Sequence, residues 1–322
     1  MFFKNFKVWE TEFAGRKLSV ETGKMAGLAN ASVMVRYGDT NVLCTVTASA
    51  KPREGVDFFP LSVDYEEKMY SVGRIPGSFQ RREGRASEKA ILTSRCIDRP
   101  IRPLFPKDLR NDCSVVATVM SVAPDCSHEI SAMIGVSTAI AISDIPWDGP
   151  ISGVNVGLVD GEIVLNPTLE QRAKTDLNLT VASTADLVAM IEAGGNEISD
   201  DLMFDCIMAG HEENKKIVKF IQGIVDEIGK PKFAYESSDP APEIMKEIED
   251  FCIEDVKKAL DTDDKLVRDE ALLPIYEAVH EKFDERFEGN EGKIEEIRYL
   301  VQMHGVRSWL KDEHKRVDGR GI

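Results

Sequence analysis

The chain has 322 residues, and at about 150 residues per domain this length predicts two domains. Apolar residues make up 43% and charged residues 30% of the sequence, which excludes wholesale disorder and supports a packed core. No run reaches the roughly 18 apolar residues of a membrane helix, so no membrane partner is predicted. The first seven residues contain no apolar signal core, so we expect no signal peptide and a cytoplasmic protein.

The 40 basic and 56 acidic residues give a net charge of −16, which excludes general nucleic-acid binding through bulk charge but still allows a local basic patch. The six cysteines form no CxxC pair. Scattered cysteines of this kind are typical of reduced core thiols, and they predict neither a disulfide framework nor a metal site.

Strands joined as hairpins are predicted at the start of the chain. Runs rich in Val, Thr and aromatic residues indicate four strands: 6–13, 17–22, 32–37 and 41–47. The turns Ala14-Gly15 and Gly38-Asp39 join them in pairs.

A helix pattern follows over 87–97. We expect this helix to end near Asp98, because Pro100 and Pro103 disfavour helix in the residues before them.

The middle of the chain alternates between strands and helices. The predicted elements are a strand at 114–122, a helix at 129–142, a hairpin of 151–159 with 162–165, a strand at 177–182 and a helix at 200–228. The helix at 129–142 is apolar nearly all round, which indicates a buried helix packed on a sheet. Together these elements predict an α/β or α+β core of about 235 residues.

Composition changes at 236–242, which has the character of a linker. Three helices are predicted after it: 243–260, 265–287 and 293–311. Residues 236–296 contain 21 acidic and 8 basic residues, so this segment holds most of the acidity of the chain. A solvated helical face explains the charge most simply, and an acidic docking surface is the alternative.

The segment 74–110 is the basic counterpart, with ten basic and four acidic residues. Eight of the ten basic residues are arginines, whose fork of donors suits phosphate oxygens. Within it, the loop 73–85 places Phe79 beside Arg81 and Arg82, an arrangement typical of single-stranded nucleic-acid binding. An ordinary basic loop with Phe79 packed in the core is the alternative.

Arg95, Arg99 and Arg102 are spaced four and three residues apart and would share one face of a continuous helix. They could bind phosphate or partner carboxylates, whereas the alternative is structural ion pairing, for example with Asp98. Further along, Ser127 is predicted as an ordinary helix N-cap, although a helix N-terminus can also bind an anion.

Several motifs together resemble those of bacterial polynucleotide phosphorylases, a family of polyribonucleotide nucleotidyltransferases. They are Thr22-Gly-Lys-Met-Ala26, Gly38-Asp-Thr40, Ser78-Phe-Gln-Arg-Arg-Glu-Gly-Arg85, Arg95-Cys-Ile-Asp-Arg-Pro-Ile-Arg-Pro-Leu-Phe-Pro106 and Lys315-Arg-Val-Asp-Gly-Arg-Gly-Ile322. The resemblance spans essentially the whole chain.

This resemblance implies an α+β fold. It consists of a ribonuclease PH-type core (ribosomal protein S5 domain 2-like, mixed sheets with packed helices) followed by an all-α helical domain. Implied domains are a first core at 1–235, the helical domain at 236–314 and the truncated opening of a second core at 315–322. Members of the family are about twice as long, with a second core and two further RNA-binding domains.

The resemblance also implies the reaction. The family degrades RNA from the 3′ end, with inorganic phosphate as co-substrate attacking the terminal phosphodiester and releasing a nucleoside diphosphate. Its catalytic residues and its Mg²⁺ ligands lie in the second core, so no catalytic residue and no metal ligand is expected here.

Laid over the family's catalytic pattern, the first core looks degenerate. The serine-rich phosphate loop falls on Ser127-His-Glu129, a catalytic acid on Asn178 and a catalytic lysine on Thr180. An amide carries no charge for a metal, and threonine supplies neither the cation nor the proton donor. We therefore expect this chain to be inactive alone.

The family pattern assigns roles to the basic residues. Implied RNA-binding residues are Phe79, Gln80, Arg81, Arg82 and Arg85, with Gln80 standing where a second Phe is common. Arg95, Arg99 and Arg102 are implied to lie near the substrate phosphate. Implied partners are single-stranded RNA, two further copies in a homotrimer ring and proteins of the RNA-degradation machinery. The alternative function is a structural oligomerisation or interaction module without direct RNA contact.

Overall fold

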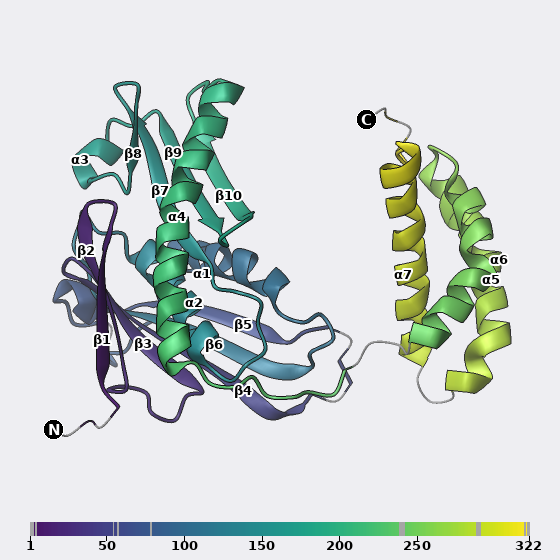
Figure 1. The fold of residues 1–322 in the computed structure, drawn as a ribbon, viewed down its shortest axis with the longest axis horizontal. Helices are drawn as coiled ribbons and strands as arrows, with labels where there is room; N and C mark the ends of the chain where they lie inside the picture. Colours follow the sequence, from purple (N-terminus) through teal and green to yellow (C-terminus); the bar gives the residue numbers. More distant parts are fainter. Residues whose placement is uncertain are drawn as a thin grey trace. The chain divides into compact units, whose positions relative to one another are not determined.

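The computed structural model describes residues 3, 5–53, 55–56, 58–77, 79–237, 242–287, 291–318 and 320. The chain divides into two compact units, Met1–Ser237 and Ser238–Ile322 (Figure 1). Ser78, most of the predicted linker and the last residues of the 315–322 segment lie outside the described residues.

The first unit contains a six-stranded sheet in the order β1-β2-β3-β4-β6-β5. Its strands are β1 Lys7–Phe13, β2 Arg16–Thr22, β3 Ala31–Tyr37, β4 Thr40–Pro52, β5 Leu61–Glu67 and β6 Asn111–Ser121. All neighbours pair antiparallel except β5 and β6, which are parallel. The first four strands confirm the hairpins predicted from the sequence.

A second, four-stranded sheet follows in the order β10-β9-β7-β8, and all its pairs are antiparallel. Its strands are β7 Ser152–Val159, β8 Glu162–Leu165, β9 Leu177–Ser183 and β10 Val188–Gly195. Helix α4 (Asp200–Ile228) packs on β7 and β9, and the short helix α3 (Leu169–Arg172) lies beside β7 (Figure 1).

Helix α2 (His128–Ile142) is the central element of the core. It packs on β3, β4 and β6 of the first sheet and also touches β7 and α4. Of its 15 residues 13 are buried, which confirms the buried helix predicted from its uniform apolarity. A Cβ at Gly135 would lie 2.5 Å from the Cys44 Sγ atom, so the close approach of this helix to β4 requires glycine.

The prediction that helix α1 ends near Asp98 is wrong. The helix runs from Glu88 to Ile101 with Pro100 inside it, and the 3₁₀ turn η2 (Arg102–Leu104) follows. Ile97, Pro100 and Ile101 are all buried, so apolar packing outweighs the backbone hydrogen bond that proline cannot form.

Strands β5 and β10, helix α3 and the 3₁₀ turn η1 (Met69–Val72) were not expected from the sequence. Leu61, Val63 and Tyr65 of β5 alternate with polar residues, a short signal that could have indicated this strand. Strand β10 ends in Gly194-Gly195, which weakens its strand pattern.

The second unit is helical, as predicted. It contains α5 Pro242–Leu260, α6 Lys265–Phe283, η3 Asp284–Phe287, α7 Glu291–Ser308 and a π-helical end, η4 Trp309–Glu313. Its core is built from one apolar face of each long helix, with Val256, Val279 and Val301 among its fully buried side chains. No helix among the described residues is long and apolar enough to cross a membrane.

A buried carboxylate on α4 fixes the turn between β1 and β2. The Ala14 N–H donates to the Glu213 Oε1 atom at 2.7 Å, and Lys216 pairs with the other oxygen at 2.6 Å. The side chain of Glu213 is 7% exposed, so the hydrogen bond forms away from bulk water.

We expect Glu213→Ala to lower the free energy of unfolding by about 1–3 kcal/mol, because it leaves the Ala14 N–H without its acceptor. Urea unfolding followed by circular dichroism measures the change. The neighbouring Glu212 is the matched control, because its side chain is 62% exposed and pairs with Lys215 on the surface. An equal loss in Glu212→Ala would contradict the anchoring role of Glu213.

Candidate functional site

The first unit contains a cleft of about 1030 Å³ walled by α1, the start of α2, α3 and the strands β7, β9 and β10. Five cationic side chains line it: Lys89, Arg95, Arg99, Arg102 and Arg172. Three acidic side chains share the lining, namely Asp98, Glu129 and Glu192. The cleft is therefore cationic in a chain whose net charge is −16.

Helix α1 brings the three predicted arginines together. Because the helix continues through Pro100 and Arg102 keeps helical backbone angles, Arg95, Arg99 and Arg102 all line the same cleft. The structure thus confirms that they share one side, which the sequence had left open.

Ion pairs occupy two of these arginines. Arg99 pairs with Glu192 of β10 at 2.8 Å, and Arg102 pairs with Asp98 at 2.8 Å. Arg102 also donates to the Leu61 carbonyl oxygen at 3.1 Å. Arg95, by contrast, is exposed and forms no ion pair with any residue that the structure describes.

Arg172 is a further cation in the cleft, and no motif in the sequence pointed to it. It donates through Nη2 to the Pro124 carbonyl oxygen, while its buried Nε atom has no acceptor among the described residues. Arg172 ends the short helix α3, which begins with a capping box between Thr168 and Gln171. The pattern Thr-x-x-Gln was the available sequence signal for this helix.

The N-terminus of α2 forms one wall of the cleft. Ser127 accepts the Ile130 N–H at 3.2 Å and donates its own hydroxyl to the Glu129 Oε2 atom at 2.8 Å, so the predicted N-cap role is confirmed. Glu129 also pairs with Lys89 at 2.8 Å. Burial opposes its charge, but His128, Lys89 and Ser127 together lower the pKa of Glu129 to about 2.

His128, beside Glu129, faces a different hollow. Its imidazole forms a hydrogen bond with the Tyr65 hydroxyl and lies stacked against that ring, with the ring centroids 6.1 Å apart. Burial lowers the pKa of His128, so the neutral imidazole is favoured near pH 7.

Asn178 and Thr180 line the opposite wall of the cleft, from strand β9. Thr180 donates its hydroxyl to the Asn155 Oδ1 atom at 2.9 Å. Within the described parts of the chain, no group of three or more His, Cys, Asp or Glu side chains could hold a metal ion.

A second hollow of about 890 Å³ lies between strand β5 with η1 on one side and the loop 76–87 on the other. Gln80, Arg82 and Arg85 line it together with Tyr65 and His128. Phe79 is 101% exposed, so the alternative that packed it in the core is wrong. The RNA-binding role of these loop residues stays a prediction.

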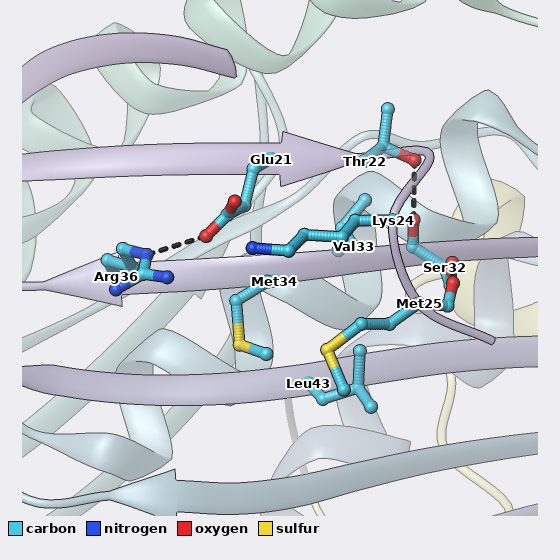
Figure 2. Close-up of a pocket in the computed structure, with 9 residues that line it drawn as sticks. All are labelled: Glu21, Thr22, Lys24, Met25, Ser32, Val33, Met34, Arg36 and Leu43. Carbon is cyan, nitrogen blue, oxygen red and sulfur yellow. Dashed lines mark hydrogen bonds and ion pairs between the residues drawn. The ribbon is translucent and has the colours of Figure 1, made fainter. Parts of the chain in front are cut away.

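A third pocket, of only about 40 Å³, lies over β2, β3 and β4 (Figure 2). Figure 2 shows two of its polar groups already paired: the Arg36 Nε atom lies 2.6 Å from the Glu21 carboxylate, and the Thr22 hydroxyl donates to the Ser32 carbonyl oxygen at 2.6 Å. It is too small for a nucleotide, and the cleft is the stronger candidate.

Three family models match the chain. Domain 1 of the 3′ exoribonuclease family matches residues 14–146, and domain 2 of that family matches residues 149–213. The polyribonucleotide nucleotidyltransferase RNA-binding domain matches residues 243–321.

Curated relatives show the same relationship. The polyribonucleotide nucleotidyltransferases of Ruminiclostridium cellulolyticum and Lachnoclostridium phytofermentans are 55% and 52% identical to the chain over 317 and 318 residues. Each alignment covers 98% of this chain but only 45% or 46% of the relative, so the chain spans about half the length of these proteins.

A crystal structure of rice (Oryza sativa) Rrp46 shares the fold, with a TM-score of 0.52 at 16% sequence identity. The superposition covers 69% of this chain and 95% of the rice chain. Together with the family matches, it shows a ribonuclease PH-type α+β core followed by a helical region, as the sequence predicted.

The lowered pKa of Glu129 makes a prediction about acid stability. Its folded pKa of about 2 lies below the ordinary value of 4.5, so its contribution to stability is complete above pH 4.5 and is lost as the pH falls toward 2. Between pH 5 and pH 2 we expect the free energy of unfolding to fall less in Glu129→Gln than in the wild type, by up to about 3 kcal/mol. Denaturant unfolding at several pH values measures it, with the exposed Glu162→Gln as control. A loss in Glu129→Gln as steep as in the wild type would contradict this assignment.

Proposed function

Because the chain belongs to the polyribonucleotide nucleotidyltransferase family and spans about half the length of its relatives, we propose that it supplies the RNA channel and ring scaffold of a phosphorolytic 3′ exoribonuclease. In this reaction inorganic phosphate attacks the terminal phosphodiester of single-stranded RNA and a nucleoside diphosphate leaves. We propose further that this chain alone has no phosphorolytic activity.

One observation supports the proposal: where the resemblance implies a catalytic acid and a catalytic lysine, the cationic cleft has Asn178 and Thr180. Arg95 and the Nε atom of Arg172 are donors without partners among the described residues, so the cleft can hold phosphate oxygens. Phosphorolysis also needs a proton donor for the departing 3′ oxygen and extra positive charge in the transition state. Asn178 and Thr180 supply neither, and the Ser127 hydroxyl is bonded to Glu129.

The loop 73–87 supports the channel role. It carries the exposed Phe79 and several arginines, of which Arg81 and Arg85 form no ion pair with a described residue. A base stacked on Phe79 would contribute about 1–3 kcal/mol to single-strand binding. The arginines would contact the phosphates on either side.

The remaining parts of the proposal come from the family. We assign 1–235 to the first core, 236–314 to the helical domain and 315–322 to the opening of a second core. Three copies would form the ring, in the cytoplasm, with proteins of the RNA-degradation machinery as further partners. The Mg²⁺ ligands and catalytic residues of the whole enzyme would lie outside this chain.

A structural interaction module is the second candidate function. The pairs Arg99–Glu192 and Arg102–Asp98 favour it, since both arginines already have partners within the fold. Under this alternative the cationic loop would contact other subunits, and RNA binding by the chain would show little dependence on Arg81 and Arg82.

Poly(A) binding separates the two candidates. We expect Arg81→Ala with Arg82→Ala to weaken binding and to flatten the salt dependence by about 0.7 per lost phosphate contact, because fewer counterions are released. Filter binding at several salt concentrations between about 50 and 200 mM measures this slope.

Lys17→Ala with Lys219→Ala is the matched control, since it removes two exposed cations outside the loop. Equal effects in the two double variants would assign the binding to bulk charge and support the structural module.

A further inference from the structure

A carboxylate stands in the middle of the basic loop. The loop 73–87 carries four arginines and only one acidic residue, Glu83, which directly follows Arg81-Arg82. In a surface that binds RNA phosphates, a carboxylate at this position opposes binding by repulsion. Its presence therefore needs a different physical reason.

The structure shows what this carboxylate does. The Met69 N–H donates to the Glu83 Oε1 atom at 2.9 Å, across 14 residues of chain. Met69 is the first residue of the 3₁₀ turn η1, where the backbone N–H groups have no partner within the turn. Glu83 therefore caps η1 and joins residue 83 of the loop to the segment that precedes the loop.

A second contact fixes the end of the loop. The Ser87 hydroxyl donates to the Glu67 Oε2 atom at 2.9 Å and also accepts the Ala90 N–H, so it joins the start of α1 to strand β5. The Glu83 contact lies nearer the loop tip and is thus better placed to set the direction of Arg81 and Arg82.

The environment of the loop explains why the hydrogen bond between Glu83 and Met69 matters. Gln80, Arg82 and Arg85 line the hollow of about 890 Å³, so this part of the loop borders open space. Arg81 has a φ of 53°, in the left-handed region that is unfavourable for residues with a side chain. A residue with a strained backbone keeps one conformation only where nearby contacts hold the chain.

We propose that Glu83 is a positioning residue for single-stranded RNA. Its carboxylate holds the backbone at Met69 and so keeps Phe79, Arg81 and Arg82 in the conformation that contacts the strand. This inference rests on the proposed function of the loop and deepens it.

Positioning by Glu83 and simple electrostatics predict opposite effects of removing its carboxylate on RNA binding. Removing an acid from a cationic loop should tighten RNA binding if charge alone matters. If Glu83 positions the loop, Glu83→Ala weakens poly(A) binding by about fivefold, the equivalent of one hydrogen bond. Glu83→Gln keeps an acceptor oxygen without the charge, so it binds poly(A) at least as tightly as the wild type.

The experiment compares the 322-residue chain with Glu83→Ala, Glu83→Gln and Glu88→Ala. Glu88 is the matched control, an exposed acid in the first turn of α1 whose removal changes the charge by the same amount. Limited trypsin digestion gives a readout that does not depend on RNA. We expect faster cleavage after Arg81, Arg82 and Arg85 in Glu83→Ala, and wild-type rates in the other two variants.

The outcomes separate this inference from the proposed function. If the wild type binds poly(A) and loses affinity in Arg81→Ala with Arg82→Ala, but Glu83→Ala binds more tightly and is cleaved at the wild-type rate, only the positioning role is overturned. If the wild type does not bind poly(A), the proposed function fails and the positioning role fails with it.

Discussion

The burial of α2 against the first sheet is the packing constraint on which both hollows of this molecule depend. Gly135 lets the helix approach β4 closely, and 13 buried residues hold its direction. Its N-terminus therefore lies at a fixed place, where His128 faces the hollow beneath the basic loop and Glu129 faces the cationic cleft. His128 and Glu129 are thus neighbours in the chain but line different hollows, one that would hold the RNA strand and one that would hold phosphate.

The charges around the cleft follow from this arrangement. Asp98, Glu129 and Glu192 pair with Arg102, Lys89 and Arg99, so three of the five cations have partners within the fold. The donors left over, Arg95 and the Nε atom of Arg172, can bind an anion. Two residues of the opposite wall, Asn178 and Thr180, present an amide and a hydroxyl, which carry no charge and do not titrate near pH 7.

Much of the fold could be predicted from the sequence because it follows from local patterns. The uniform apolarity of α2, the hairpin turns and the three helices after residue 236 are visible in the order of residue types. The end of α1 could not be predicted, because the tertiary burial of Ile97 and Ile101 outweighs the local effect of Pro100. Strand β10, with its two glycines, depends on pairing with β9 rather than on its own propensity.

Some residues of the candidate site could likewise be predicted from the sequence, and others could not. The arginines of α1 and the loop could be selected from their spacing and density, and the motifs pointed to the family. Arg172 could not, because its place in the cleft arises from the packing of α3 beside β7, distant in sequence from α1. The contact between Glu83 and Met69 was hidden for the same reason, since a hydrogen bond across 14 residues leaves no local pattern.

Phosphorolysis by the isolated chain tests the central claim most directly. The purified protein is mixed with labelled poly(A), inorganic phosphate and magnesium, and the release of ADP is followed alongside poly(A) binding. The account predicts that RNA is bound and no ADP is released. Steady, phosphate-dependent release of ADP would contradict it, and would mean that the cleft around Asn178 and Thr180 has a catalytic arrangement of its own.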